Sequence, residues 1–260
     1  MVAPLLFASL LAAAFLAGGI DAIVGGGGLV QIPALFSALP GARPATVLAT
    51  GKLAGLLGTT SAAARYLRSV RLSWPLLLPI IGAALLASLG GAMTASHVAP
   101  AVFRPLVPVM LGLVLLYTLL RRDLGEVHAP RTLGPAARGA GVLLAAAIGF
   151  YDGFFGPGTG SFLMVLFIRL YGFDFVHAAA SARVVNVATN ATALGWFTWH
   201  DPPLWPVGLA MAAANAIGGL VGARAAISGG TRLIRPVFVG VVAALIAKTG
   251  WDVLAPALAR

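Results

Sequence analysis

The sequence predicts an all-α integral membrane protein, and three observations lead to this fold class. Hydrophobic residues make up 60% of the chain and charged residues only 9%, whereas soluble domains average about 25% charged residues. The apolar stretches are continuous, as at 106–120, and lack the alternation that a membrane β-barrel requires. The second half of the chain also repeats the first at a constant offset of 131 residues. Duplicated apolar halves are typical of secondary transporters.

The repeat defines the expected organisation of the chain. We predict a first membrane repeat over residues 1–120, a cytoplasmic linker over 121–138 and a second membrane repeat over 139–260. The matching residues include Asp21 and Asp152, Gly25 and Gly156, Lys52 and Arg183, and Trp74 and Trp205. Each of these tryptophans precedes a proline at an expected helix start, a position where tryptophan anchors a helix at the membrane interface.

Each repeat is predicted to contain five helical segments, of which the second is too short to span a bilayer alone. In the first repeat the segments are 3–23, 28–39, 45–66, 74–95 and 101–120. In the second repeat they are 139–154, 159–171, 176–198, 205–226 and 232–253. Because a span needs about 20 apolar residues, we expect the first two segments to form a glycine-broken helical hairpin, followed by three transmembrane helices. Whether each hairpin spans the membrane or is re-entrant stays open.

The placement of Arg and Lys indicates how the repeats are oriented. If each hairpin returns to its starting side, the repeats have inverted topology, and eleven of the 17 Arg and Lys residues lie on one side of the membrane against three on the other. If each broken segment crosses once, the repeats are parallel and the numbers become 8 and 6. Cytoplasmic loops are enriched in Arg and Lys. We therefore predict two inverted-topology repeats, with the linker inside and both termini outside.

Glycine clusters interrupt the apolar sequence at equivalent places, within 18–33 and 149–162. Glycine adopts backbone angles closed to other residues, and a non-helical turn in hydrocarbon needs protein or water to satisfy it. We therefore expect both breaks to face the interior of the bundle. The helix that restarts after each break offers unpaired N–H groups and a partial positive charge, which suits an anion. Close helix packing is the alternative, and the simpler interpretation for Gly18 and Gly19.

Two cations lie inside expected helices at equivalent positions, Lys52 and Arg183. A charge roughly 10 Å into the membrane costs about 3 kcal/mol unless it is paired or solvated. Helical spacing places Thr59 on the face of Lys52, and Asn186 and Asn190 on the face of Arg183. Snorkelling of both cations to the surface is the alternative. The predicted substrate-binding set is Lys52, Arg183, Gly26, Gly27, Gly28, Gly158, Thr159, Gly160, Thr59, Asn186 and Asn190.

Asp21 and Asp152 each precede a glycine break by four residues. Three roles are open for them. They could form ion pairs with Lys52 or Arg183, cap the restarted helix, or carry a coupling proton. A structural cap or ion pair is the simpler interpretation.

Other classes of function find no support in the sequence. The net charge of +10 would suit nucleic-acid binding in a soluble protein, but the cations flank apolar stretches and no nucleic-acid motif is present. The chain has no Cys, no HExxH motif and no Ser-His-Asp order, so we expect no enzyme activity, no catalytic residues, no cofactor and no metal site. His97 and His177 are interpreted as interfacial. The glycine clusters lack the strand and the Lys-Ser/Thr of a nucleotide loop.

Family-like stretches occur along nearly the whole chain: GGGGLVQIP at 25–33, ATGKL at 49–53, GFYDGFFGPGTGSF at 149–162, ARVVN at 182–186 and LIRP at 233–236. Together they resemble the sulfite exporter TauE/SafE family, the TSUP permeases, and its YfcA-type members in particular. The resemblance implies a bacterial inner-membrane permease for sulfite, sulfonates, related sulfur oxyanions or organic acids. Members of that family often carry Asn at the position of Gly51 and Lys at the position of Arg183.

The leading hypothesis is a multi-pass permease of the bacterial inner membrane with both termini periplasmic. It would move a small anion by alternating access of the two repeats, with a proton or a sodium ion as candidate coupling ion. Its expected partners are the anion and the lipid bilayer, with no nucleic acid, and the sequence does not indicate an oligomeric state. The alternatives are an anion channel and a membrane assembly factor without cargo.

Overall fold

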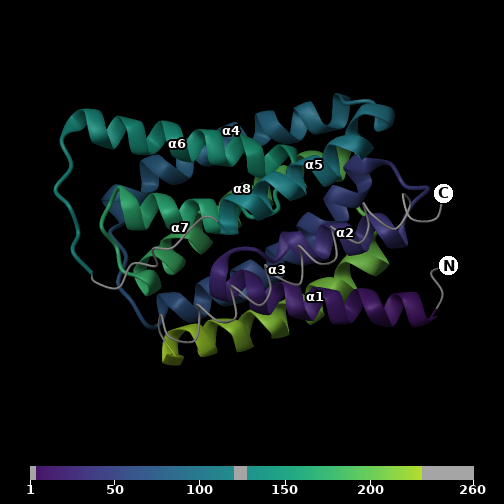
Figure 1. Ribbon diagram of the computed structural model, residues 1–260, viewed down its shortest axis with the longest axis horizontal. Coiled ribbons are helices and arrows are strands. Elements are labelled where there is room, and N and C mark those ends of the chain that lie inside the picture. Colours follow the sequence, from purple (N-terminus) through teal and green to yellow (C-terminus); the bar gives the residue numbers. More distant parts are fainter. Residues whose placement is uncertain (1–3, 120–127, 230–260) are drawn as a thin grey trace.

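The computed structural model describes residues 4–119 and 128–229, and in these ranges it consists of helices joined by short loops (Figure 1). The first half contains α1 (Pro4–Val24), α2 (Gly28–Ala38), α3 (Pro44–Leu67), α4 (Trp74–His97) and α5 (Pro100–Leu119). The second half contains α6 (Pro135–Phe154), α7 (Thr159–Arg169) and α8 (Phe175–His200), followed by the helix Trp205–Gly229. The predicted all-α class is confirmed for these residues. The predicted helix 232–253 lies outside them.

Three of the described helices are long and apolar enough to cross a membrane by length and composition: Pro4–Val24, Trp74–His97 and Trp205–Gly229. The helices α3 and α8 are as long, with 24 and 26 residues, but they carry the buried polar stripes of Lys52 and Arg183. The helices α2 and α7 have 11 residues each, too short for a span, as predicted. Large apolar side chains such as Leu86 and Leu143 are exposed on the outside of the bundle, where a membrane protein meets lipid.

Proline and an aspartate define several helix starts. Pro44 and Pro135 stand at the beginning of α3 and α6, where a missing N–H costs no helical hydrogen bond. For this reason α6 begins ahead of the predicted residue 139. Asp174 caps α8 by accepting a hydrogen bond from the backbone N–H of His177 at 2.8 Å. The helices that begin with Trp74 and Trp205 start at the predicted residues, and both tryptophans are nearly half exposed.

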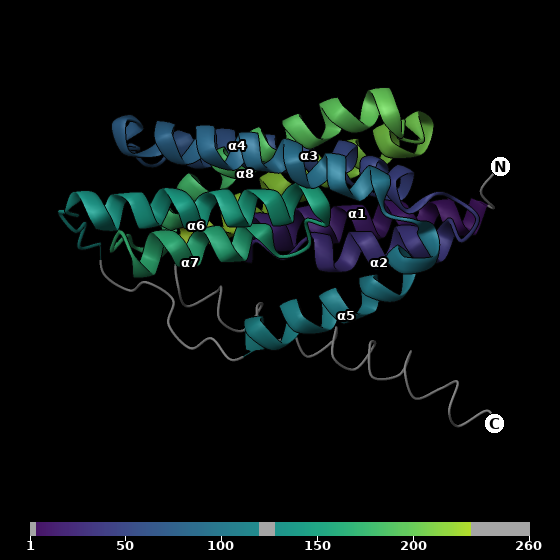
Figure 2. The ribbon, with the colours of Figure 1, turned by 90° about the horizontal axis from the view of Figure 1, so that it is seen from above.

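The two glycine breaks meet in the middle of the molecule. Gly25 follows α1 with a φ of +83°, and Gly156 and Gly158 follow α6 with φ of +99° and +84°, values that favour glycine. The backbone N–H of Ser161 donates to the carbonyl of Gly25 at 3.2 Å, and its hydroxyl donates to the carbonyl of Val24 at 2.6 Å. From this point α2 and α7 run toward opposite ends of the long axis, and α1 and α6 likewise begin at opposite ends (Figures 1 and 2).

Close contacts between the halves occur in matching pairs: where a residue of the first half touches one of the second, their repeat equivalents touch as well. The helix Trp205–Gly229 packs against α1 through glycine, and α4 packs against α6 in the same way. At each of these contacts a Cβ added to the glycine would overlap the facing backbone carbonyl. The contact of Gly18 with Asn215 matches that of Gly149 with Ala84. In the same way, the contact of Gly222 with Gly19 matches that of Gly91 with Phe150. Gly18 therefore serves close packing, the simpler of its two interpretations.

The halves enclose a polar centre between apolar layers. The largest buried apolar cluster draws on α1, α3, α4, α6, α7, α8 and the helix Trp205–Gly229, and two smaller clusters include residues of α2. In Figure 2, α5 lies at the margin of the bundle, in contact with it through Phe103 and Val107. The helices α3 and α8 pack against each other beside the glycine breaks, which places their polar stripes at the centre.

Candidate functional site

A cavity lies where the two glycine breaks meet α3 and α8. It contains about 530 Å³ of empty space, its open mouth included. Most of the predicted substrate-binding residues line it: Lys52, Gly27, Gly28, Gly158, Thr159, Gly160, Thr59, Asn186 and Asn190. Asp21 and Asp152 line it as well. Two members of the predicted set, Gly26 and Arg183, are not among the lining residues.

Lys52 of α3 forms an ion pair with Asp152 of α6, so the pair joins the two halves. Lys52 Nζ lies 2.8 Å from Asp152 Oδ2, and both side chains are buried, at 6% and 2% exposure. Both residues line the cavity. The pair neutralises Lys52, whose charge would be costly to leave unpaired away from water.

Arg183 of α8 pairs with Asp21 of α1, and this pair also joins the two halves. Arg183 Nε lies 3.7 Å from Asp21 Oδ2, and its Nη2 donates to the backbone carbonyl of Asp21. Arg183 is fully buried, whereas Asp21 is 16% exposed and lines the cavity. Arg183 Nη1 faces the backbone of Gly160. The guanidinium therefore lies behind Asp21 and beside the second glycine break.

Asp21 and Asp152 each form an ion pair with a cation of the other half, one of the three roles considered for them. The residues Gly27 and Gly158 stand at the N-caps of α2 and α7, and neither helix has a side-chain cap. Asp21 also accepts a hydrogen bond from the hydroxyl of Thr59 at 3.3 Å. The two carboxylates thus hold the cations in place instead of holding the helix ends.

Amides line the α8 side of the cavity. Asn190 donates through Nδ2 to Asn186 Oδ1 at 2.9 Å, so the two side chains are ordered by each other. Some N–H groups of the restarted helices are already used, since those of Leu29 and Val30 donate to the carbonyls of Gly26 and Gly27. A ligand in the cavity would meet a lysine, two hydroxyls, amides and glycine backbone, next to the two carboxylates. Once Lys52 is released from Asp152, these groups are a donor set for an oxyanion.

Sequence reasoning missed two polar residues of the cavity, Gln31 and Asn215. Asn215 donates through Nδ2 to Gln31 Oε1 at 2.7 Å, and Gln31 donates through Nε2 to the carbonyl of Gly51 at 2.8 Å. Both side chains are buried and line the cavity. Gln31 lies in the GGGGLVQIP stretch, which was a usable signal. Asn215 has Ala84 at the matching position of the first half, so the repeat gave no hint of it.

Comparison with known proteins identifies the family of the chain. The family model described as sulfite exporter TauE/SafE matches residues 10–249. The "Probable membrane transporter protein YfcA" of Escherichia coli K12 is 38% identical over 97% of this chain and 92% of its own length. The "Probable membrane transporter protein ORF9" of Sinorhizobium sp is 38% identical over 92% of this chain and 90% of its own length.

A "Probable membrane transporter protein" of Haemophilus influenzae is 36% identical over 95% of both chains. No solved structure matches the chain. The expected family is therefore confirmed: with a match over nearly its whole length and relatives named as membrane transporters, the chain belongs to the sulfite exporter TauE/SafE family of membrane transporters.

Proposed function

We propose that this protein is a permease that moves a small anion across the bacterial inner membrane through the central cavity. The proposal rests on two ion pairs where the glycine breaks meet: Lys52 pairs with Asp152, and Arg183 pairs with Asp21. Buried charges in membrane helices mark substrate and ion pathways. The substrate would be sulfite, a sulfonate, a related sulfur oxyanion or an organic acid.

The ion pairs supply a means of coupling. Each cation is neutralised by a carboxylate, so an anion that binds Lys52 must displace Asp152 from it. The displaced carboxylate would take up a proton or a sodium ion, because an unpaired charge inside the bundle is costly. Asp21 is the more accessible of the two carboxylates and lines the cavity, whereas Arg183 does not. Asp21 would therefore take up the coupling ion without contact between the anion and Arg183. Anion and cation would then move together.

We further propose inverted repeats over residues 1–120 and 139–260, joined by a cytoplasmic linker over 121–138, with periplasmic termini. The matching glycine contacts and the opposite directions of the two hairpins support this arrangement. The excess of Arg and Lys on one predicted side supports it too. Rocking of one repeat against the other would open the cavity to each side in turn.

The proposal is tested by anion-dependent thermal stabilisation of the purified protein in detergent. Wild-type protein should be stabilised by at least one anion of a series containing sulfite, thiosulfate, an alkylsulfonate and a carboxylate. The double variant Lys52→Ala/Asp152→Ala stays neutral but lacks the lysine, so its stabilisation should be lost. The matched control is Arg43→Ala/Asp201→Ala. It removes an ion pair that lies outside the cavity lining, with 2.7 Å between Arg43 Nη1 and Asp201 Oδ1. If the anion stabilises both double variants equally, Lys52 is not part of the binding site.

Transport by the reconstituted protein tests the mechanism. Liposomes preloaded with the stabilising anion should show saturable counterflow of the labelled anion from outside. Imposing a proton gradient and then a sodium gradient identifies the coupling ion by which of them drives accumulation. Unitary currents in a planar bilayer, with flux that does not saturate, would instead indicate a channel.

A further inference from the structure

The end of the linker is fastened to the turn between α7 and α8. The backbone N–H of Ala129 donates to the carbonyl of Gly172 and that of Arg131 to the carbonyl of Tyr171, both at 3.0 Å. Gly172 has a φ of +74°, and a Cβ there would overlap the carbonyl of Ala129. A glycine is therefore required at this turn for the linker to approach it closely. The contact brings His128 to the beginning of α8.

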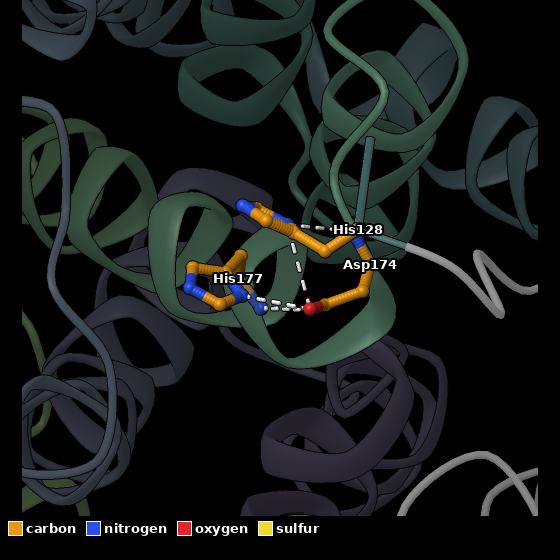
Figure 3. A group of neighbouring side chains, drawn as sticks. All are labelled: His128, Asp174 and His177. Carbon is orange, nitrogen blue, oxygen red and sulfur yellow. Dashed lines mark hydrogen bonds and ion pairs between the residues drawn. The ribbon is translucent and has the colours of Figure 1, made fainter. Parts of the chain in front are cut away.

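His128 meets Asp174 and His177 there, as Figure 3 shows. The Nδ1 atom of His128 lies 3.4 Å from Asp174 Oδ2, and Nδ1 of His177 lies 2.9 Å from the same oxygen. One ligand atom from each of the three residues lies within 4.8 Å of the others. The two imidazole rings are stacked, with centroids 3.9 Å apart. Two ring nitrogens thus converge on one carboxylate.

The hydrogen bonds around His128 leave an electron-rich gap between it and the carboxylate. The backbone N–H of Asp174 donates to His128 Nδ1 at 3.3 Å, so this nitrogen presents a lone pair. The same nitrogen faces Asp174 Oδ2, which is also an acceptor. One nitrogen cannot accept from the amide and donate to the carboxylate at once. A bound cation would take the single lone pair of Nδ1 in place of the long amide contact, and would bind the carboxylate oxygen as well.

We propose that His128, Asp174 and His177 form a Zn²⁺ site that fastens the end of the linker to the start of α8. Zinc binds imidazole nitrogen and carboxylate oxygen at about 2.0–2.2 Å, which places tetrahedral ligand atoms about 3.3 Å apart. The observed nitrogen–oxygen distances of 3.4 Å and 2.9 Å are near that spacing. The two stacked imidazoles would turn so that the planes of both rings contain the ion. Water would complete the coordination, since three protein ligands leave a position open.

The site is outside the central cavity and does not depend on the transported substrate. None of its three residues lines that cavity. Bound zinc would tie residue 128 of the linker to residues 174 and 177 of the second half, so it would restrain the segment that joins the two halves. The expectation of no metal site considered only residues close in sequence, whereas His128 lies 46 residues from Asp174.

Zinc binding to full-length protein tests the proposal. The protein is purified in detergent without a polyhistidine tag, stripped with a chelator and titrated with Zn²⁺ against a fluorescent zinc indicator. Wild-type protein should bind one equivalent. His128→Ala and His177→Ala each remove a ligand, so each should weaken binding by more than the roughly 10- to 100-fold that outer-shell changes cost. Cobalt substitution should give the visible absorption bands of a low-symmetry Co²⁺ site, absent from both variants.

The chain supplies its own controls, because it contains only four histidines. His97→Ala and His200→Ala remove the other two imidazoles, and both should bind zinc like wild type. Asp174→Asn keeps a good N-cap but loses the anionic ligand, so it separates folding of α8 from metal binding. Wild-type protein that binds no zinc would overturn the proposal. So would wild-type affinity in His128→Ala, or loss of binding in His97→Ala or His200→Ala. The zinc site and the proposed function are tested independently, because anion-dependent stabilisation is measured in a separate experiment.

Discussion

The two halves of the protein place a cation at the same repeat position but expose it differently. Lys52 and its partner Asp152 both line the cavity, with Nζ and Oδ2 2.8 Å apart. Arg183 is fully buried behind its partner Asp21, and only the carboxylate reaches the cavity. Equivalent positions in a duplicated sequence therefore need not have equivalent surroundings. Under the proposed function, Lys52 would meet the anion directly and Arg183 would act through Asp21.

The chemistry of the two side chains explains the difference. The guanidinium of Arg183 has several donors in a plane. One of them reaches the backbone carbonyl of Asp21 near the end of α1, while Nη1 faces Gly160 at the other break. Arg183 thus contacts both glycine breaks. Lys52 carries a compact charge on a flexible stem, which suits a group that exchanges partners.

The largest effect is expected when the carboxylates are removed one at a time. Asp21→Asn leaves Arg183 buried and charged, since arginine does not lose its proton in proteins, and should cost about 3–5 kcal/mol of unfolding free energy. Asp152→Asn should cost less, because lysine can give up its proton and Lys52 lines the cavity. Denaturation of the two variants under identical detergent conditions gives the comparison. Equal losses, or a larger loss for Asp152→Asn, would contradict the assigned difference.

The glycine breaks provide a second comparison. Gly25→Ala forces a residue into the left-handed region at about 1–2 kcal/mol, and its Cβ would overlap the backbone of Gly160 and Ser161, which adds about 1–3 kcal/mol. Gly156→Ala also needs a positive φ, but its Cβ would meet the flexible end of Lys52 at 3.0 Å and would approach the backbone carbonyl of Asp152 only to 3.3 Å. We therefore expect Gly25→Ala to lower the melting temperature more than Gly156→Ala.

Gly26→Ala is the matched control for this pair. An added Cβ at Gly26 would lie 3.7 Å from Leu29, an ordinary contact. Its cost should stay below about 1 kcal/mol, in the range of a glycine substitution without strain. A melting temperature for Gly26→Ala as low as that of Gly25→Ala would mean that the breaks do not depend on the close approach at Gly25.

Most of the fold was predictable because its signals are local. The glycine clusters predicted the breaks at Gly25 and Gly156, and prolines and tryptophans marked helix starts such as Trp74. The offset of 131 also brought Lys52 and Arg183 together in one hypothesis, and the structure places both beside the breaks. Repeated local patterns carry such information because each copy must solve the same packing problem.

The rest depended on which side chains meet across the bundle. Nothing in the sequence paired Lys52 with Asp152 in preference to Asp21, because the choice follows from how the halves pack. The burial of Arg183 behind Asp21 could not be predicted for the same reason. Asn215 lines the cavity, but its repeat equivalent Ala84 is not polar, so the repeat did not indicate it. His128 lies beside the start of α8, although the sequence indicated the linker only as a connection.

Asn215 allows the asymmetry of the cavity to be tested. Asn215→Ala leaves Gln31 Oε1 without its 2.7 Å donor, which should cost about 1–3 kcal/mol. The change makes the position identical to Ala84 of the first half. If Gln31 and Asn215 help to hold the anion, the anion concentration needed for half-maximal stabilisation should rise relative to wild type. An unchanged concentration would assign the pair a purely structural role.

A small effect is expected for Arg183→Lys, the most direct test of whether Arg183 acts through Asp21. Lysine keeps the positive charge near the carboxylate but loses the donation from Nη2 to the backbone carbonyl of Asp21, worth about 0.5–1.5 kcal/mol. Because the guanidinium does not line the cavity, the order of preference among anions should stay the same, as measured by thermal stabilisation with the same series. A changed order would mean that the planar fork of Arg183 touches the anion, and the two cations would then share one role.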